Sequence, residues 1–142
     1  MSKRRGLSLA LYVHLPWCVS KCPYCDFNSH ALQGELPAER YIAALEADLE
    51  TQAPLVAGRP IVSVFFGGGT PSLFPPEAIA RVLEHTRGLL GLAPDAEITL
   101  EANPGTIERG RFAGYRDAGV NRVSLGAQTF DAAMLQTLGR IH

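Results

Sequence analysis

The stretch LSLALYVHLPWCVSKCPYC, residues 7–25, joins an apolar run to a tight group of thiols. Cys18, Cys22 and Cys25 are the only three cysteines in the chain, and their spacing is C-x3-C-x2-C. An odd, clustered set of thiols predicts a metal site or a reactive centre, because a disulfide framework needs paired cysteines and an oxidising compartment. The stretch therefore predicts a strand that leads directly into a functional loop.

The overall composition is that of an ordinary globular chain, with 46% hydrophobic and 19% charged residues. The formal net charge is -1 and the 13 Lys and Arg residues are scattered, so the sequence gives no electrostatic reason to expect nucleic acid. The apolar run meets a His and a Pro, and it is too short and wrongly flanked for a signal peptide or a membrane span. We therefore expect a cytoplasmic protein.

Strand-like and helix-like segments alternate along the chain. The predicted strands are short apolar runs at Leu7 to Val13, Ile61 to Phe66, Glu97 to Ala102 and Arg122 to Gly126. The predicted helices have apolar residues at helical spacing, and they run from Pro37 to about Val56, Pro76 to Leu90, Ile107 to Ala118 and onward from near Asp131. Four βα units in a row predict an α/β fold with a parallel sheet and right-handed crossovers.

The loops that follow the predicted strands hold the most distinctive residues, and they read HLPWCVSKCPYCDFNSH, GGGTPSLF, EANPGT and AQTF. Because the carboxyl ends of parallel strands meet at one edge, we expect these loops to form a common rim that carries the site. The chain stops at LGRIH, partway into the fourth predicted helix. We therefore expect the truncated N-terminal part of a larger (βα) barrel, with an apolar helix face left uncovered.

Spacing alone leaves three interpretations of the thiols open. A [4Fe-4S] cluster held by three thiolates uses all three and leaves one iron free to bind something else. A zinc-stabilised binding module usually has four ligands in two separated pairs, so His14 or His30 would have to complete the set. A catalytic or redox thiol leaves two close neighbours unexplained. The spacing favours the cluster.

The thiol spacing and the loop motifs resemble those of a known protein family. The thiol spacing, with Tyr24 just before the last cysteine, resembles the signature of the radical S-adenosylmethionine (radical SAM) enzymes. Within them, the chain is similar to the family of HemW haem chaperones and oxygen-independent coproporphyrinogen III oxidases, on YVHLPWCVSKCPYCDFNSH, GGGTPSLF, EANPGT, GVNRVSLGAQTF and LGRIH. The resemblance covers essentially all of residues 1–142 as a radical SAM core domain. The oxidases typically place a fourth Cys where this chain has Phe27, so the resemblance favours the chaperones.

The resemblance implies a set of cofactors. Cys18, Cys22 and Cys25 would hold a [4Fe-4S] cluster whose free iron binds the amino and carboxylate groups of S-adenosylmethionine (SAM). Reduction would then yield methionine and a 5'-deoxyadenosyl radical. The implied SAM contacts are Tyr12, Tyr24, Gly68, Gly69, Thr70, Glu101, Gln128 and Arg140.

The chemistry of these residue types suits that role. Bare glycine backbone admits a close approach by the methionine amino group, Glu101 and Gln128 can bond the ribose hydroxyls, and the fork of Arg140 matches a carboxylate. Without the resemblance, each of these residues also has a structural explanation. The glycines would form a plain turn, and Glu101 and Gln128 would be solvated residues at strand ends. Arg140 would be a solvent-facing helical arginine, and the two tyrosines would pack in the core.

The function implied is that of a haem chaperone, which binds haem and delivers it to acceptor proteins. The alternative is the oxygen-independent oxidase, which decarboxylates coproporphyrinogen III in haem biosynthesis, so whether the protein is an enzyme stays open. The expected partners are haem or a porphyrin, haem-accepting proteins and an electron donor such as flavodoxin or ferredoxin, with no nucleic acid. Membrane association during delivery is left open. Haem handling is expected to depend on a C-terminal part beyond this chain.

Overall fold

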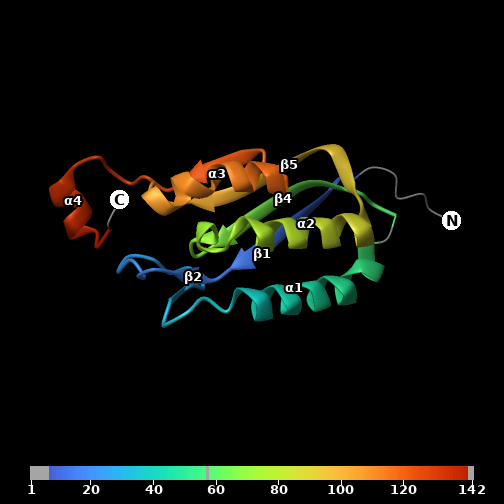
Figure 1. Cartoon of the computed structure of the whole chain (residues 1–142), viewed down its shortest axis with the longest axis horizontal. Coiled ribbons are helices and arrows are strands. Elements are labelled where there is room, and N and C mark those ends of the chain that lie inside the picture. Colours follow the sequence, from blue (N-terminus) through green and yellow to red (C-terminus); the bar gives the residue numbers. More distant parts are fainter. Residues whose placement is uncertain (1–6, 57, 141–142) are drawn as a thin grey trace.

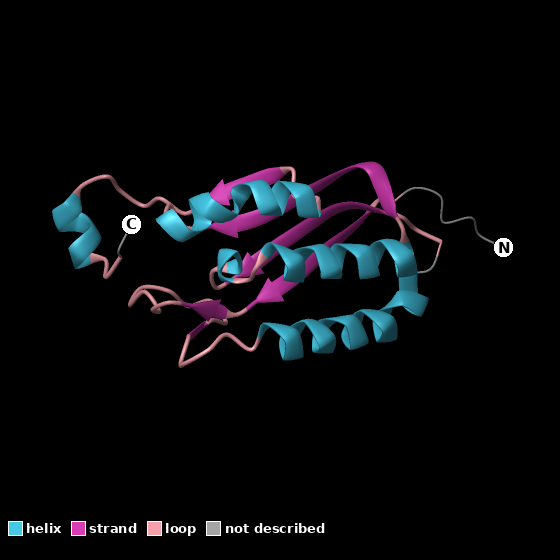
Figure 2. Ribbon diagram, viewed as in Figure 1, coloured by secondary structure: helices cyan, strands magenta, loops and turns pink. Residues whose placement is uncertain are grey.

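One parallel sheet organises the computed structural model, which describes residues 7–56 and 58–140. The sheet contains four strands in the spatial order β1 (Leu9–Leu15), β4 (Ile61–Gly68), β5 (Leu92–Ala102) and β6 (Arg122–Leu125). The connecting helices lie side by side along one face of the sheet, and they are α1 (Ala38–Gln52), α2 (Pro76–Leu90) and α3 (Thr106–Ala118) (Figures 1 and 2). The prediction of an α/β chain built from successive βα units is confirmed.

Several element boundaries differ from the predicted ones. Strand β4 ends at Gly68, two residues later than expected, and β5 begins at Leu92, five residues earlier than expected. Strand β1 starts and ends two residues later than expected, because Leu15 is fully buried and still pairs with Gly68 of β4. The first predicted helix divides into α1 and a 3-10 turn, η1 (Ala53–Val56). An unpredicted two-stranded sheet also forms between β2 (Trp17–Cys18) and β3 (His30–Ala31).

The hydrophobic core lies between the sheet and the helices. Along β1, Val13 and Leu15 are buried in the core, whereas Tyr12 between them is exposed, so the strand has one covered and one open face. Helix α2 buries Ile79, Val82 and Leu83 as its predicted stripe requires. The helical spacing of apolar residues in the sequence predicts that Leu89 belongs to the same buried stripe, and this prediction is wrong, since Leu89 is 42% exposed near the end of the helix.

Helix α4 (Ala132–Thr137) follows the last strand, and its start was predicted correctly. The prediction that the helix continues through LGRIH is wrong for residues 138–140, because Leu138 caps the helix and Gly139 has a φ of +69°. The side chain of Asp131 accepts a hydrogen bond from the backbone N–H of Met134 at 3.0 Å, which caps the helix. Phe130 and Met134 of this segment are largely exposed. Within residues 7–56 and 58–140, no helix combines the length and the apolar character needed to cross a membrane.

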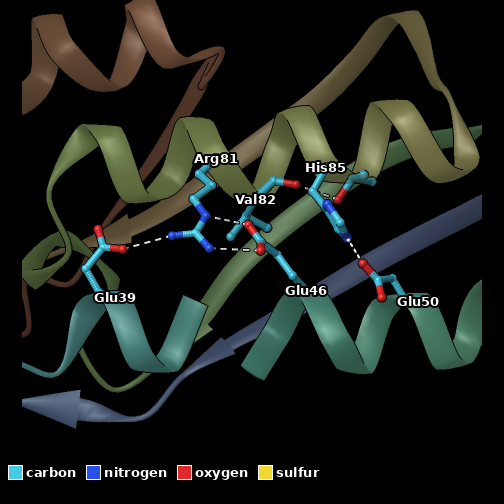
Figure 3. A network of polar contacts seen from close by, with 7 residues as sticks. Glu39, Glu46, Glu50, Arg81, Val82 and His85 are labelled. Carbon is cyan, nitrogen blue, oxygen red and sulfur yellow. Dashed lines mark hydrogen bonds and ion pairs between the residues drawn. The ribbon is translucent and has the colours of Figure 1, made fainter. Parts of the chain in front are cut away.

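The outer surface of α1 and α2 carries a network of opposite charges (Figure 3). The guanidinium of Arg81 bonds Glu46 at 2.6 Å and Glu39 at 2.9 Å. One turn further along, Nε2 of His85 lies 3.2 Å from a carboxylate oxygen of Glu50. These pairs join the two helices on the side facing away from the sheet.

Candidate metal and cofactor site

A cavity of about 220 Å³ opens at the carboxyl ends of the strands. It is lined by all the predicted site residues except Tyr12, namely Cys18, Cys22, Cys25, Tyr24, Gly68, Gly69, Thr70, Glu101, Gln128 and Arg140. These residues come from five separate segments of the chain, and distant ones meet, since Arg140 reaches Cys22 across 118 positions of sequence. The expected common rim therefore exists, with a hollow at its centre.

The cysteine loop, residues 18–29, is closed by the protein's own hydrogen bonds. At its base, the N–H of His30 donates to the carbonyl of Pro16 and the N–H of Leu32 to that of Cys18, both at 2.7 Å. Inside it, the ammonium of Lys21 donates to the carbonyls of Phe27 and Ser29, both at 3.1 Å. The backbone that carries the thiols is thus fixed from within.

The three thiols are free cysteines of intermediate exposure, and all of them line the cavity. Among the described residues, no three His, Cys, Asp or Glu side chains converge on a single metal-ion position. Ligands of one zinc ion surround one atom, whereas the thiolates of an iron–sulfur cluster bind different irons and stand further apart. Three separate thiols facing one hollow are a donor set that fits a cluster.

The glycine loop, residues 67–70, owes its composition to close packing inside the protein. Gly68 has a φ of +116°, and a Cβ there would lie 2.8 Å from the ring of His14. A Cβ on Gly69 would lie 2.5 Å from the carbonyl oxygen of Trp17. Sequence reasoning assigned these glycines to a ligand and missed this internal requirement, while the contact with a methionine amino group stays a prediction.

Helix α3 supports the turn that follows the glycine loop, η2 (Pro71–Leu73). The buried hydroxyl of Tyr115 lies 2.8 Å from the carbonyl oxygen of Ser72 and 2.6 Å from that of Phe74, and its one proton is shared between these two acceptors. Arg111 donates to the carbonyl of Leu73 at 2.9 Å. The glycine loop and the turn after it are therefore held between residues 15–17, which lead into the cysteine loop, and α3.

Glu101 places a poorly solvated carboxylate at the end of β5. Burial raises its pKa, and a hydrogen bond from the backbone N–H of Gly68 offsets part of that effect. Burial also raises the pKa of Tyr12, and the negative charge of Glu101 adds to the rise. A carboxylate that water solvates poorly gains more than an exposed one from binding a cationic ligand group.

Tyr12 lies beside the cavity and is linked to the cysteine loop through His14. The hydroxyl of Tyr12 donates to Nδ1 of His14 at 2.9 Å, and Nε2 of His14 donates to the carbonyl of Asn28 at 2.7 Å. The direction follows because the Asn28 carbonyl only accepts, so Nε2 carries the proton and Nδ1 is the acceptor. The structure thus gives Tyr12 a supporting role, and its predicted contact with SAM stays a prediction.

Arg140 follows α4 and its guanidinium turns into the cavity. It donates to the carbonyl of Gly126, to the hydroxyl of Tyr24 at 3.2 Å and to the side-chain oxygen of Asn103 at 3.4 Å. The alternative of a solvent-facing helical arginine is therefore wrong. Asn103 also donates to the hydroxyl of Thr70 at 3.2 Å, so it connects two loops of the rim. Sequence reasoning missed this residue, although its place in EANPGT directly after β5 was a usable signal.

Comparisons with known proteins agree with this geometry. The chain matches the radical SAM superfamily over residues 12–142. It is 54% identical, over 94% of its length, to the heme chaperone HemW of Escherichia coli (strain K12). It is 42% identical, over 96% of its length, to the heme chaperone HemW of Mycobacterium tuberculosis (strain ATCC 25618 / H37Rv). The chain spans 35% and 36% of these two relatives, or about a third of each.

A solved structure is similar along almost the whole chain. Coproporphyrinogen III oxidase (HemN) from Escherichia coli, described as a radical SAM enzyme, superposes with a TM-score of 0.87 and 34% sequence identity. The match covers 95% of this chain and 31% of the oxidase. The resemblance inferred from the motifs is confirmed by both comparisons, and this chain belongs to the radical SAM superfamily.

Proposed function

We propose that this chain is the cofactor-binding part of a haem chaperone of the HemW kind. The observation that carries the proposal is the single cavity at the strand ends, which gathers three free thiols, a glycine loop, a desolvated carboxylate and a guanidinium. The heme chaperones with 54% and 42% identity share this part of the chain. Haem binding and delivery would involve the remaining two thirds of such a protein.

Within the cavity, Cys18, Cys22 and Cys25 would hold a [4Fe-4S] cluster, and SAM would lie beside it. When both are bound, they supply one-electron chemistry that yields a 5'-deoxyadenosyl radical. The chain's own residues position the cofactor: the fork of Arg140 suits a carboxylate, and the carboxylate of Glu101 suits an amino group or ribose hydroxyls.

The remaining predicted contacts have supporting places in the same proposal. The hydroxyl of Tyr24 already bonds Arg140 at 3.2 Å, so the two side chains would act together at one end of SAM. Gln128 lines the cavity with an amide that both donates and accepts, as a ribose requires. Gly68, Gly69 and Thr70 line the same cavity, where their backbone would contact the methionine amino group.

Phe27 favours the chaperone over the oxidase. It lies on the cysteine loop, lines the cavity and is 63% exposed, at the position where oxidases of the family typically carry an additional Cys. The oxidase stays the second candidate, because the solved oxidase shares this fold at a TM-score of 0.87. The higher identity to chaperones, 54% against 34%, supports the first candidate.

The proposal extends to partners and location. A reducible cluster needs an electron donor, for which flavodoxin or ferredoxin would serve, and a reducing compartment, for which we propose the cytoplasm. The ligand would be haem or a porphyrin, and the protein partners would be those that accept haem. Delivery at a membrane surface is compatible with this arrangement.

Anaerobic reconstitution with iron and sulfide tests the cofactor. The full-length protein should turn brown and hold about four irons per chain. Replacing Cys18, Cys22 or Cys25 by Ala should abolish iron retention, because two thiolates hold such a cluster poorly. Stoichiometric zinc without iron-dependent absorption in the unmodified protein would establish the zinc-stabilised module instead.

Assays of the reconstituted protein separate the two functions. It should bind haem, and with SAM and a reductant it should leave coproporphyrinogen III undecarboxylated. Phe27→Cys should not introduce decarboxylation, because the porphyrinogen must also be oriented toward the radical, and one thiol does not build that pocket. Robust decarboxylation by the unmodified protein would identify the oxidase and leave the cofactor proposal intact.

A further inference from the structure

Ser29 places a buried hydroxyl against one of the three thiols. Only 2% of the residue is exposed, and its Oγ lies 3.9 Å from Sγ of Cys25. The backbone on both sides of this hydroxyl is fixed. The N–H of Ser29 donates to the carbonyl of Phe27 at 2.8 Å, and the Ser29 carbonyl accepts from the Lys21 ammonium at 3.1 Å. The hydroxyl is thus held beside Cys25.

The competing acceptor for this hydroxyl is already saturated. The carbonyl oxygen of Phe27 lies 3.5 Å from Oγ of Ser29, at the limit of a hydrogen bond. The same oxygen accepts the backbone N–H of Ser29 at 2.8 Å and the ammonium of Lys21 at 3.1 Å. A carbonyl oxygen has two lone pairs, and both are used by these shorter bonds. The hydroxyl proton is therefore available to the sulfur.

A thiolate is a better acceptor for that proton than a neutral thiol, because hydrogen bonds to charged acceptors are the stronger ones. A Cys25 that held iron would be a thiolate, and its sulfur would accept a hydrogen bond from the hydroxyl of Ser29. Such a bond withdraws electron density from the ligand, which stabilises the reduced form of a cluster.

We propose that Ser29 is a positioning residue for the cluster, which donates an O–H···S hydrogen bond to the Cys25 thiolate and raises the reduction potential. The inference rests on the proposed cluster. It adds that Ser29 influences how readily this cluster accepts an electron. Arg140 lies 3.8 Å from the sulfur of Cys22, but its guanidinium would be needed by the SAM carboxylate. Ser29 has no such second task, so its effect would persist when SAM is bound.

The test uses Ser29→Ala, which removes only the hydroxyl, and Ser8→Ala as the control, an exposed serine that does not line the cavity. Both variants of the full-length protein are reconstituted anaerobically, and the midpoint potential of the cluster is measured by a redox titration followed by electron paramagnetic resonance. Ser29→Ala should keep the iron content of the unmodified protein and have a more negative midpoint potential. Ser8→Ala should match the unmodified protein in both the iron content and the midpoint potential.

An unchanged potential in Ser29→Ala with full iron content would overturn the proposal, and iron loss from the folded variant would make the hydroxyl a structural contact instead. A measurement on the unmodified protein keeps the proposal testable if the variant does not fold. Its iron–thiolate stretching bands in resonance Raman spectra should shift on transfer to D₂O, and absence of any shift would refute the bond. A protein that takes up no iron at all would contradict the proposed cluster itself.

Discussion

The helical surface and the cavity shift the pKa of a glutamate in opposite directions. On the surface, a hydrogen bond from Arg81 lowers the pKa of Glu46, so the charged form is stabilised by the fold. In the cavity, burial raises the pKa of Glu101, and a backbone N–H from Gly68 compensates only in part. A charge that the fold stabilises belongs to the scaffold, whereas one that the fold leaves poorly solvated marks a place where a ligand can bind.

Two glycines, one in the cavity wall and one on the helical surface, differ in the same way, and we expect their substitution to change the free energy of unfolding more. A Cβ on Gly69 of the cavity wall would lie 2.5 Å from the carbonyl oxygen of Trp17 and 2.9 Å from the carbonyl carbon of Pro16. A Cβ on Gly88 of α2 would meet nothing within 4 Å. The first position is demanded by packing of backbone against backbone, and the second is not.

The largest expected effect therefore comes from Gly69→Ala. The added methyl group must push the Pro16–Trp17 backbone away, which would break the bond from the N–H of Gly69 to the carbonyl of Leu15, now 2.8 Å. We expect a loss of about 1 to 3 kcal/mol in the free energy of unfolding, measured by chemical denaturation. Iron content should fall as well, since the displaced segment leads into the cysteine loop.

Gly88→Ala is the matched control with the opposite sign. Alanine is the better helix former, so this variant should gain roughly 0.5 to 1 kcal/mol in the same measurement. If the two substitutions had equal effects, the glycine loop would not be under the steric constraint that the structure shows.

The sequence could predict what depends on consecutive residues. The strands, the thiol spacing and the four rim loops are local patterns, and the rule that parallel strands end at one edge was sufficient to bring Cys22 and Glu101 to one cavity. Arg140 follows α4 instead of a strand, and only the family resemblance indicated its place there. Other features depend on contacts between distant segments. The backbone of Trp17 against Gly69, and the hydroxyl of Tyr115 on the turn after the glycine loop, leave no mark in either local sequence.

Leu89 shows the limit of periodicity within a helix. Its spacing matches the buried stripe of α2, but it lies in the last turn, and at 42% exposure the core no longer covers it. Thr86 is fully buried one turn earlier, with its hydroxyl donating to the carbonyl of Val82 at 2.8 Å. A pattern gives the direction in which a side chain points, and only the neighbouring elements determine whether something covers it.

An intermediate effect is expected from Glu101→Gln. SAM binding should weaken by about 1 to 3 kcal/mol, measured by calorimetry on the reconstituted protein, because a charged acceptor is lost. Without SAM, the variant should be slightly more stable than the unmodified protein at neutral pH. The sign follows from the raised pKa of Glu101, since its charged form is the unfavourable one in the folded state, so the gain should vanish as acid protonates the carboxyl.

Glu97→Gln is the control for this variant, since Glu97 lies on the same strand but is exposed and pairs with Arg122 at 3.8 Å. It should leave SAM affinity unchanged. If iron content in Glu101→Gln fell in step with SAM affinity, the end of β5 would support the cysteine loop and would not be a ligand contact.

The smallest effect is expected from Glu46→Gln on the helical surface. Because Arg81 lowers the pKa of Glu46, the pair contributes stability above the ordinary pKa of a glutamate, and that contribution is lost as the pH falls through the lowered value. The melting temperature at neutral pH should drop by no more than about 2 °C, since exposed ion pairs contribute little, and the difference should shrink in high salt and in acid. Glu84→Gln, at an exposed position of the neighbouring helix α2, is the reference for loss of a charge without this partner.

A loss of stability as large as that of Gly69→Ala would mean that the network of Figure 3 holds α1 in place. The helical surface would then be as sensitive to substitution as the cavity.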